Sequence, residues 1–240
     1  MLFQPEAKRA FVRRMFDRIA GTYDLLNHVL SLGVDILWRK KTIEALNPVT
    51  GWRILDLATG TGDLGFEAVG RAPGIDVVGV DLSTPMMRRG VAKMGPRRGR
   101  MVFLSGDAEC LPFPDGVFDG LTIGFGIRNV ARLEIGLEEM FRVLKPGGCL
   151  AVLEFSRPRG VLFRGLYTVY FRYVLPQIGR VISRNPGAYR YLYESVMQFP
   201  EGADFCRHLS EAGFSEISER RLTSGIATLY LASRASDNAC

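Results

Sequence analysis

Histidine and cysteine are scarce in this sequence of 240 residues. The two histidines, His28 and His208, lie far apart and have no nearby group of cysteines or acidic residues at metal-ligand spacing, so we expect no metal site. The four cysteines are scattered without a C-x-x-C pair, at Cys110, Cys149, Cys206 and Cys240. A chain with enough apolar sequence for its own core needs no disulfides, and this pattern predicts a reducing, cytoplasmic location.

Long apolar runs, internal repeats and low-complexity linkers are also absent. No run approaches the roughly 20 residues that a membrane-spanning helix requires. The arginine-rich first 18 residues lack the apolar core of a secretory signal, and the acids Glu6 and Asp17 do not suit a transit peptide. We therefore expect one domain over residues 1–240, without a spanning helix or a removable leader.

The net charge does not indicate which kind of partner the protein binds. The chain carries a formal net charge of +6, which is compatible with nucleic acid or with an anionic membrane surface. The hydrophobic fraction of 47% supports a sizeable core. Function must therefore be read from the motifs.

A buried strand that runs into a glycine loop is the most informative stretch. Residues 60–65 match the G-x-G-x-x-G pattern that binds dinucleotides, but a single match is weak support. Asp56 ends the strand and Asp63 begins the next helix, so a pyrophosphate would meet two carboxylates. S-adenosylmethionine fits better. Its positively charged sulfonium and ammonium groups are attracted by the acids, and its carboxylate can accept hydrogen bonds from the N–H groups of Gly60, Thr61 and Gly62.

Two further acids follow the next two strands. Asp81 stands about 20 residues after the glycines, the interval at which an acid binds ribose hydroxyls. Asp107 is placed to accept from the adenine amino group, and the Ala108 N–H faces the ring. Each acid alone would more often be a helix cap or a turn residue. Three of them in register behind a glycine loop predict a nucleoside cofactor site.

Strands and helices alternate from residue 52 onward, which predicts a parallel sheet covered on both faces. The expected strands are residues 53–57, 77–81, 101–104, 117–123 and 149–155, followed by an antiparallel final pair at 215–222 and 227–232. Residues 1–50 read as a helical cap, and residues 156–199 read as a helical insertion before the last pair. Ligands of such sheets bind beyond the carboxyl ends of the strands.

The insertion carries an aromatic stripe beside a basic face. The stripe consists of Phe163, Tyr167, Tyr170, Phe171 and Val174, and the basic face holds Arg164 and Arg172 with Thr168. A stripe of this kind is most often core packing. Next to a basic face it also suits an acceptor pocket for an apolar substrate, or a helix lying on anionic lipid headgroups.

Several longer motifs resemble those of the UbiE/MenG family of quinone C-methyltransferases. They are YDLLN at 23–27, SLG at 31–33, DLATGTGDL at 56–64, GFGIRNV at 124–130, RVLKPGG at 142–148 and LEFS at 153–156. The similarity runs from about Phe11 to Leu231. Two positions depart from many relatives, which have a histidine where this chain has Asp35 and a serine where it has Gly124.

The resemblance implies a class I methyltransferase fold, an α/β sheet of seven mostly parallel strands. It also implies S-adenosylmethionine contacts at Thr61, Asp81, Asp107 and Ala108. The implied reaction is methylation of demethylmenaquinol to menaquinol, of the polyprenyl methoxybenzoquinol of the ubiquinone pathway, or of both, and the sequence does not choose between them. The expected partners are thus a polyprenylated quinol and an anionic membrane surface, without nucleic acid.

Arg128 and Asn129, after the fourth strand, are the expected catalytic residues. Arginine stays protonated, so Arg128 would stabilise the developing phenolate, and Asn129 would orient the ring. Tyr23 and His28 in the cap are weaker candidates for reaching the acceptor.

Other enzyme classes fit the residues less well. A nucleic-acid amino-methyltransferase would have an Asn/Asp-Pro-Pro-aromatic motif after the fourth strand, where this chain has GIRN at 126–129. A cytosine C5 enzyme needs a Pro-Cys pair, which does not occur. A C-methyltransferase of sterols or other lipids would use the same cofactor half and stays open as the alternative.

Overall fold

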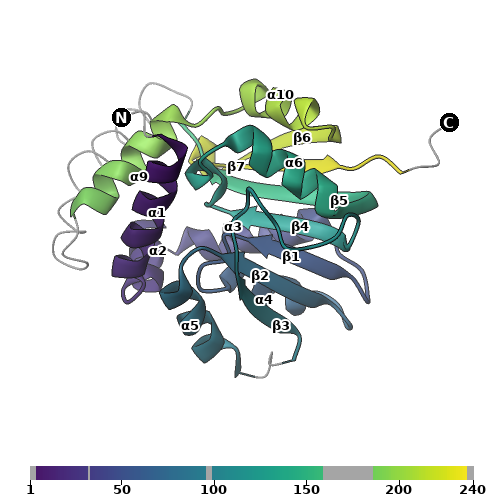
Figure 1. The fold of residues 1–240 in the computed structure, drawn as a ribbon, viewed down its shortest axis with the longest axis horizontal. Helices are drawn as coiled ribbons and strands as arrows, with labels where there is room; N and C mark the ends of the chain where they lie inside the picture. Colours follow the sequence, from purple (N-terminus) through teal and green to yellow (C-terminus); the bar gives the residue numbers. More distant parts are fainter. Residues whose placement is uncertain (1–3, 32, 96–98, 159–185, 237–240) are drawn as a thin grey trace.

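The computed structural model describes residues 4–31, 33–95, 99–158 and 186–236. Seven strands form one sheet in the order β3-β2-β1-β4-β5-β7-β6 (Figure 1). The strands are β1 (Arg53–Leu57), β2 (Asp76–Asp81), β3 (Met101–Ser105), β4 (Phe118–Gly124), β5 (Leu144–Phe155), β6 (Ser215–Leu222) and β7 (Ala227–Ser233). The first five pair in parallel, and β7 is antiparallel to both of its neighbours. The predicted sheet with its antiparallel last strand is therefore confirmed.

One strand is longer than expected. The sequence predicts a tight turn before a strand at residue 149, whereas β5 already begins at Leu144 and pairs there with Phe118. Gly147, with a φ of 79°, lies inside the strand, and the register between β4 and β5 shifts between Phe118 and Gly120. From Leu144 to Cys149 β5 advances five residues, while its partner β4 advances two from Phe118 to Gly120, so the irregular stretch is absorbed without ending the strand.

Helices cover both faces of the sheet. They are α1 (Pro5–Ile19), α2 (Tyr23–Ser31), α3 (Val34–Leu46), α4 (Asp63–Val69), α5 (Thr84–Lys93), α6 (Leu133–Val143), α9 (Pro186–Gln198) and α10 (Ala203–Glu211). Side chains of β1 alternate between two apolar clusters: Leu55 and Leu57 join the cluster of α6 and α10, and Ile54 joins that of α3 and α4. Since successive strand residues point to opposite faces, the two clusters are the two layers of the core.

The three N-terminal helices do not act as one cap. In Figure 1, α1 and α2 lie with α9 beyond one end of the sheet. In contrast, α3 packs on the sheet face, where Trp38 and Ile43 are fully buried. The Trp38 Nε1–H also donates to the Thr223 Oγ1 at 2.8 Å. Residues 34–46 therefore belong to the core layer, and the cap expected over residues 1–50 is limited to α1 and α2.

Part of the expected insertion is described. Helix α9 packs on α1, where the rings of Tyr191 and Phe11 are 5.2 Å apart and meet edge to face. The aromatic stripe from Phe163 to Val174 and its basic face lie outside the described residues. Among the helices that are described, none is both long and apolar enough to cross a membrane.

A carboxyl group is buried inside the sheet. Asp56 on β1 is 1% exposed and accepts hydrogen bonds from the hydroxyls of Thr59 at 2.5 Å and Thr122 at 2.7 Å. Burial raises the pKa of Asp56 to about 6, although the two hydroxyls oppose the shift. The folded state therefore holds a proton on this group at pH values where the unfolded chain has lost it.

The packing of α3 predicts that substitutions at two neighbouring residues change the free energy of unfolding by very different amounts. Trp38→Ala removes a buried ring and should lower the free energy of unfolding by about 3–5 kcal/mol. Leu37→Ala, at a side chain that is 48% exposed, should change it by less than about 0.5 kcal/mol. Urea unfolding of both variants measures the difference. Equal effects would mean that α3 is a detachable cap after all.

The raised pKa of Asp56 predicts a pH-dependent stability. Because the folded state binds the proton more tightly, the free energy of unfolding should fall as pH rises from about 4 to above 6. The loss is about 3 kcal/mol for a shift of this size. Asp56→Asn cannot titrate, so its urea-unfolding profile should lack this fall. The same change at the exposed Asp76 is the control, and identical profiles for wild type and Asp56→Asn would contradict the assignment.

Candidate functional site

A cleft lies beyond the carboxyl ends of β1 to β4, where parallel sheets bind ligands. It encloses about 760 Å³ of empty space, part of it open to solvent. Its wall contains Gly60, Asp81, Asp107 and Ala108, four of the residues predicted to bind the cofactor. The structure therefore brings the ends of three separate strands to one cavity.

Asp81 holds the glycine loop in place. The Gly60 N–H donates to one carboxylate oxygen of Asp81 at 2.8 Å, and the Ser83 N–H donates to the other at 2.7 Å. Gly60 has a φ of 57°, and a Cβ on it would stand 3.3 Å from the Met86 methyl group. Burial raises the pKa of Asp81, against the effect of its two backbone donors. Each oxygen retains a lone pair that could accept from a hydroxyl group.

Asp107 is held from the opposite side by α1. Its carboxylate lies 2.5 Å from the Arg9 Nε and also accepts the Glu109 N–H at 3.0 Å. The Arg9 Nη2 reaches the buried Glu109 at 2.9 Å. Glu109 in turn accepts from the backbone of Ala131 and from Arg132. Asp107 thus stands at the cavity as predicted, but with a cation partner that the sequence did not reveal.

Further contacts fasten α1 across the cleft. The Lys8 Nζ donates to the carbonyl oxygens of Arg128 at 3.1 Å and Val130 at 2.7 Å. Farther along the helix, Asp17 accepts from the Ser83 hydroxyl at 2.6 Å. Because both ends of the helix are tied to loops that carry the site, α1 forms one wall of the cavity and covers it.

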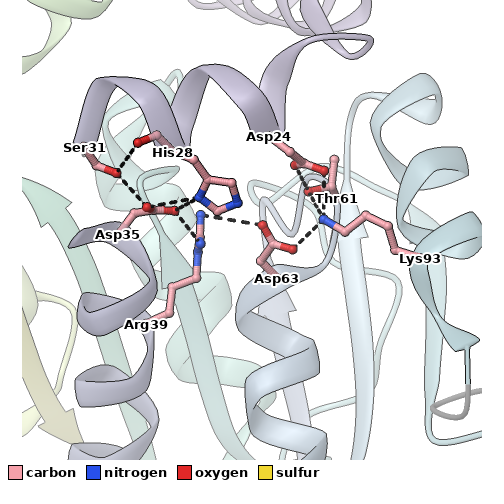
Figure 2. A network of polar contacts seen from close by, with 8 residues as sticks. All are labelled: Asp24, His28, Ser31, Asp35, Arg39, Thr61, Asp63 and Lys93. Carbon is pink, nitrogen blue, oxygen red and sulfur yellow. Dashed lines mark hydrogen bonds and ion pairs between the residues drawn. The ribbon is translucent and has the colours of Figure 1, made fainter. Parts of the chain in front are cut away.

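A second, smaller cavity of about 380 Å³ lies beside the first. Both share Tyr23, Ala58, Gly124 and Phe125 in their walls, so they are neighbours across this strip. Asp56, Thr61 and Asp63 line the smaller cavity and are absent from the wall of the larger one. The Thr61 hydroxyl donates to Asp24 of α2 at 2.6 Å, as Figure 2 shows.

Gly62 lies in the wall of neither cavity, and its role in this structure is to shape the backbone. It precedes α4 with a φ of 86°, and a Cβ there would stand 2.7 Å from the Phe103 ring. The residue is needed for the turn that brings the loop to the helix. The prediction that it binds the cofactor stays untested.

The cavities suit the adenosyl cofactor predicted from the sequence. The larger one lies at the ends of the strands that carry the predicted acids Asp81 and Asp107. In the wall of the larger cavity, Gly106 packs so closely on Val80 that a Cβ would stand 2.9 Å from its side chain. Acids rather than exposed N–H groups dominate around the loop, which disfavours a phosphate and favours a cationic nucleoside.

Arg128 and Asn129 are adjacent in the 3-10 turn η2 (Ile127–Asn129), but their side chains lie in different surroundings. Asn129 lines the larger cavity and accepts from the Tyr191 hydroxyl at 3.1 Å. The Arg128 side chain is 7% exposed and pairs with the buried Glu154 at 2.6 Å. It lies outside the wall of both cavities, over the Phe155 ring at 5.5 Å. In the described part of the chain, its buried Nε has no hydrogen-bond partner.

The two weaker candidates differ in position. Tyr23 lines both cavities, and burial raises the pKa of its phenol, so the hydroxyl stays protonated at neutral pH. His28 is 42% exposed, pairs with Asp35 at 3.1 Å and lies in neither wall. The structure therefore favours Tyr23 over His28 as a group near the acceptor. Within the described ranges, no three cysteine, histidine or acidic residues are grouped to hold a metal ion.

Comparison with known proteins supports the same assignment. The chain is 48% identical over 218 residues to the "Ubiquinone/menaquinone biosynthesis C-methyltransferase UbiE" of Syntrophotalea carbinolica, covering 91% of this chain and 92% of that protein. It is also 48% identical over 220 residues to the "Demethylmenaquinone methyltransferase" of Thermus thermophilus, covering 92% of this chain and all of that protein.

Solved structures show the same fold at low sequence identity. A "SAM-dependent methyltransferase" from Thermotoga maritima superposes with a TM-score of 0.67 at 20% identity, covering 92% of this chain and 99% of the other. The predicted class I methyltransferase fold is thereby confirmed. A model of the ubiE/COQ5 methyltransferase family matches residues 4–234. The chain therefore belongs to the ubiE/COQ5 methyltransferase family, as its motifs predicted, and it is a methyltransferase.

Proposed function

We propose that the protein transfers the methyl group of S-adenosylmethionine to a ring carbon of a polyprenylated hydroquinone in respiratory quinone biosynthesis. The observation that carries this proposal is the 48% identity, over more than nine-tenths of each chain, to relatives named for menaquinone and ubiquinone biosynthesis. The proposed substrates are demethylmenaquinol and the polyprenyl methoxybenzoquinol. No observation on the chain favours a sterol.

The larger cavity would hold the adenosine part of the cofactor. Asp81 offers acceptors for the ribose hydroxyls, and Asp107 with Ala108 lies where the base would be recognised. S-adenosylmethionine supplies a methyl group already activated by the sulfonium. The task of the protein is therefore to hold donor and acceptor in line and to exclude water, for which the covering helix α1 is suited.

A ring carbon becomes nucleophilic when the neighbouring hydroxyl loses its proton, so the protein must stabilise a phenolate oxygen. Arg128 lines neither cavity, so we propose that it acts through position: its guanidinium, fixed by Glu154, holds the turn η2 that presents Asn129 to the ring. Asn129 lies in the cavity wall and orients the ring together with Tyr191. The new C–C bond forms as the bond from sulfur to the methyl group breaks, which leaves S-adenosylhomocysteine and a ring ketone. The attacked carbon then gives its proton to water, the ring oxygen regains one, and aromaticity returns.

The acceptor is a membrane lipid, and we propose that the protein works on the inner face of the cytoplasmic membrane. The support is the exposed basic side chains Arg13, Arg14 and Arg18 on α1, the helix that covers the cleft. A positive surface at the entrance would hold the protein near anionic headgroups, with a weak and salt-dependent attachment. Arg13 belongs to the cavity wall itself, which links this surface to the site.

Quinone analysis tests the proposed function. Expression of the chain in a host that lacks its own enzyme should restore the methylated quinone, with a mass increase of one methylene group over the accumulated precursor. Mass spectrometry of lipid extracts measures this, and Asp81→Ala is the matched inactive control. Recovery of neither menaquinone nor ubiquinone would contradict the proposal.

The role of Arg128 predicts a loss of rate without a loss of cofactor binding. Arg128→Lys keeps the positive charge beside Glu154 but loses the planar fork that fixes the turn η2, so the acceptor is misplaced and kcat should fall by about 100-fold. The dissociation constant for S-adenosylhomocysteine should stay within about twofold, because Arg128 lines neither cavity. Calorimetry and a methyl-transfer assay give the two values.

Arg142→Lys is the matched control, because Arg142 pairs with Glu139 and Asp115 away from the cavities. It should leave kcat unchanged. A normal kcat for Arg128→Lys would remove this side chain from the mechanism.

A further inference from the structure

The turn η2 carries Asn129 to the larger cavity, but it is too short to hold its own end in place. A 3-10 turn of three residues leaves its last carbonyl groups without N–H donors from a following turn. The chain leaves the helical course at Val130, which has a ψ of 132°. Donors for these carbonyl groups must therefore come from outside the turn.

Lys8 of α1 supplies such donors. Its Nζ donates to the carbonyl oxygen of Arg128 at 3.1 Å and to that of Val130 at 2.7 Å. A lysine that binds the last carbonyl groups of a helical turn is a common way of ending one. One ammonium group thus spans the carbonyl groups of the two residues on either side of Asn129.

The residues that follow are held from the same helix. Glu109 accepts the N–H groups of Ala131 and Arg132, both at 3.0 Å. Arg9 of α1, the neighbour of the lysine, in turn binds Glu109 at 2.9 Å. Helix α1 therefore holds both the carbonyl groups and, through Glu109, the N–H groups of one continuous segment, residues 128–132.

The Asn129 side chain is held at its oxygen. Tyr191 of α9 donates its hydroxyl to the Asn129 Oδ1 at 3.1 Å. Helix α9 lies beside α1 (Figure 1), and its Tyr191 ring meets Phe11 of α1 edge to face. An amide group also carries two N–H donors. With the oxygen held by Tyr191, the nitrogen is the end that can donate to a ring oxygen of the acceptor.

Lys8 itself lies in the wall of neither cavity, whereas Arg9 and Val12 of the same helix line the larger one. Any effect of Lys8 on a bound ligand must therefore pass through the groups that it holds. The turn is held from two sides: Arg128 anchors it to Glu154 on β5, and Lys8 anchors it to α1.

We propose that Lys8 is a positioning residue for methyl transfer, which acts through Asn129 and sets where the acceptor ring stands. The inference rests on the proposed function, since the acceptor is the quinol. The alternative is that Lys8 only fastens α1 to the rest of the protein. Its loss would then loosen a helix that lines the larger cavity, so cofactor binding would weaken together with the rate.

Steady-state kinetics and calorimetry on the full chain separate these roles. Lys8→Met keeps an apolar stem and removes the donors, so the ring is misplaced. The kcat for a short-chain demethylmenaquinol should fall by about 10- to 100-fold. The dissociation constant for S-adenosylhomocysteine should stay within about twofold, which also shows that the variant is folded.

Two matched variants accompany this measurement. Lys8→Arg keeps the charge, and its fork can donate to two carbonyl oxygens, so it should recover most of the rate. Lys40→Met makes the same change at an exposed lysine of α3 and should match wild type in rate and in binding.

A double variant tests the path of the effect. Asn129→Ala removes the group that Lys8 places, so kcat is already low. Adding Lys8→Met should then lower kcat by no more than about twofold further, because residues that act through one another are not additive.

Losses that multiply in the double variant would overturn the inference. Weaker binding of S-adenosylhomocysteine to Lys8→Met, in step with the loss of rate, would do the same and assign Lys8 the fastening role. A normal kcat for Lys8→Met would also overturn it, while leaving the proposed function intact. If wild-type protein methylates neither demethylmenaquinol nor the methoxybenzoquinol, the proposed function is contradicted and the inference falls with it.

Discussion

Parallel pairing of β1 with β2 and β4 is the constraint on which the site depends. In this register Asp56 lies opposite Gly79 and Thr122, and Leu57 lies opposite Val80, so the strands end together at one edge. The glycine loop leaves β1 at that edge, and the Gly60 N–H closes onto Asp81 at the end of β2. Residues separated by some twenty positions in the chain are thereby brought within hydrogen-bonding distance. No local signal in the sequence would by itself predict that these residues lie together.

Burial of acids explains the choice of ligand. Asp56 and Glu109 are buried and Asp81 is half-buried, and each is held by hydroxyl, N–H or guanidinium donors. Such donors offset the cost of removing a carboxylate from water. They also leave negative charge near the glycine loop, where a dinucleotide would place its phosphates. The arrangement stabilises a sulfonium nucleoside and repels a pyrophosphate.

Helix α1 couples the two halves of the site. Arg9 bridges Asp107 and Glu109 on the cofactor side, and Lys8 binds the backbone on the acceptor side next to Asn129. Burial lowers the pKa of the Lys8 ammonium, although Glu109 opposes the shift. The helix that closes the cleft is therefore fastened by the same loops that carry the chemistry.

The strands and the acids at their ends could be predicted from the sequence, because apolar runs followed by glycine or aspartate carry a local signal. Asp81, Asp107 and Ala108 stand at the cavity for this reason. The partners of these acids could not be predicted, since Arg9 meets Glu109 across 100 positions of the chain. The burial of Arg128 was missed in the same way, because its ion-pair partner Glu154 lies on β5.

The same limit explains the error over the N-terminal cap. Whether a helix covers a site or a sheet face depends on packing, and the pattern around Trp38 fits both. His28 looked suitable for acid–base work by its intrinsic pKa, but it faces Asp35 rather than the cleft. Side-chain direction within the folded chain decided each of these cases.

A crystal structure of the protein with S-adenosylhomocysteine tests the central claim most directly. The account predicts the adenosine in the larger cavity between Asp81 and Asp107. Density for the nucleoside outside this cleft would contradict it.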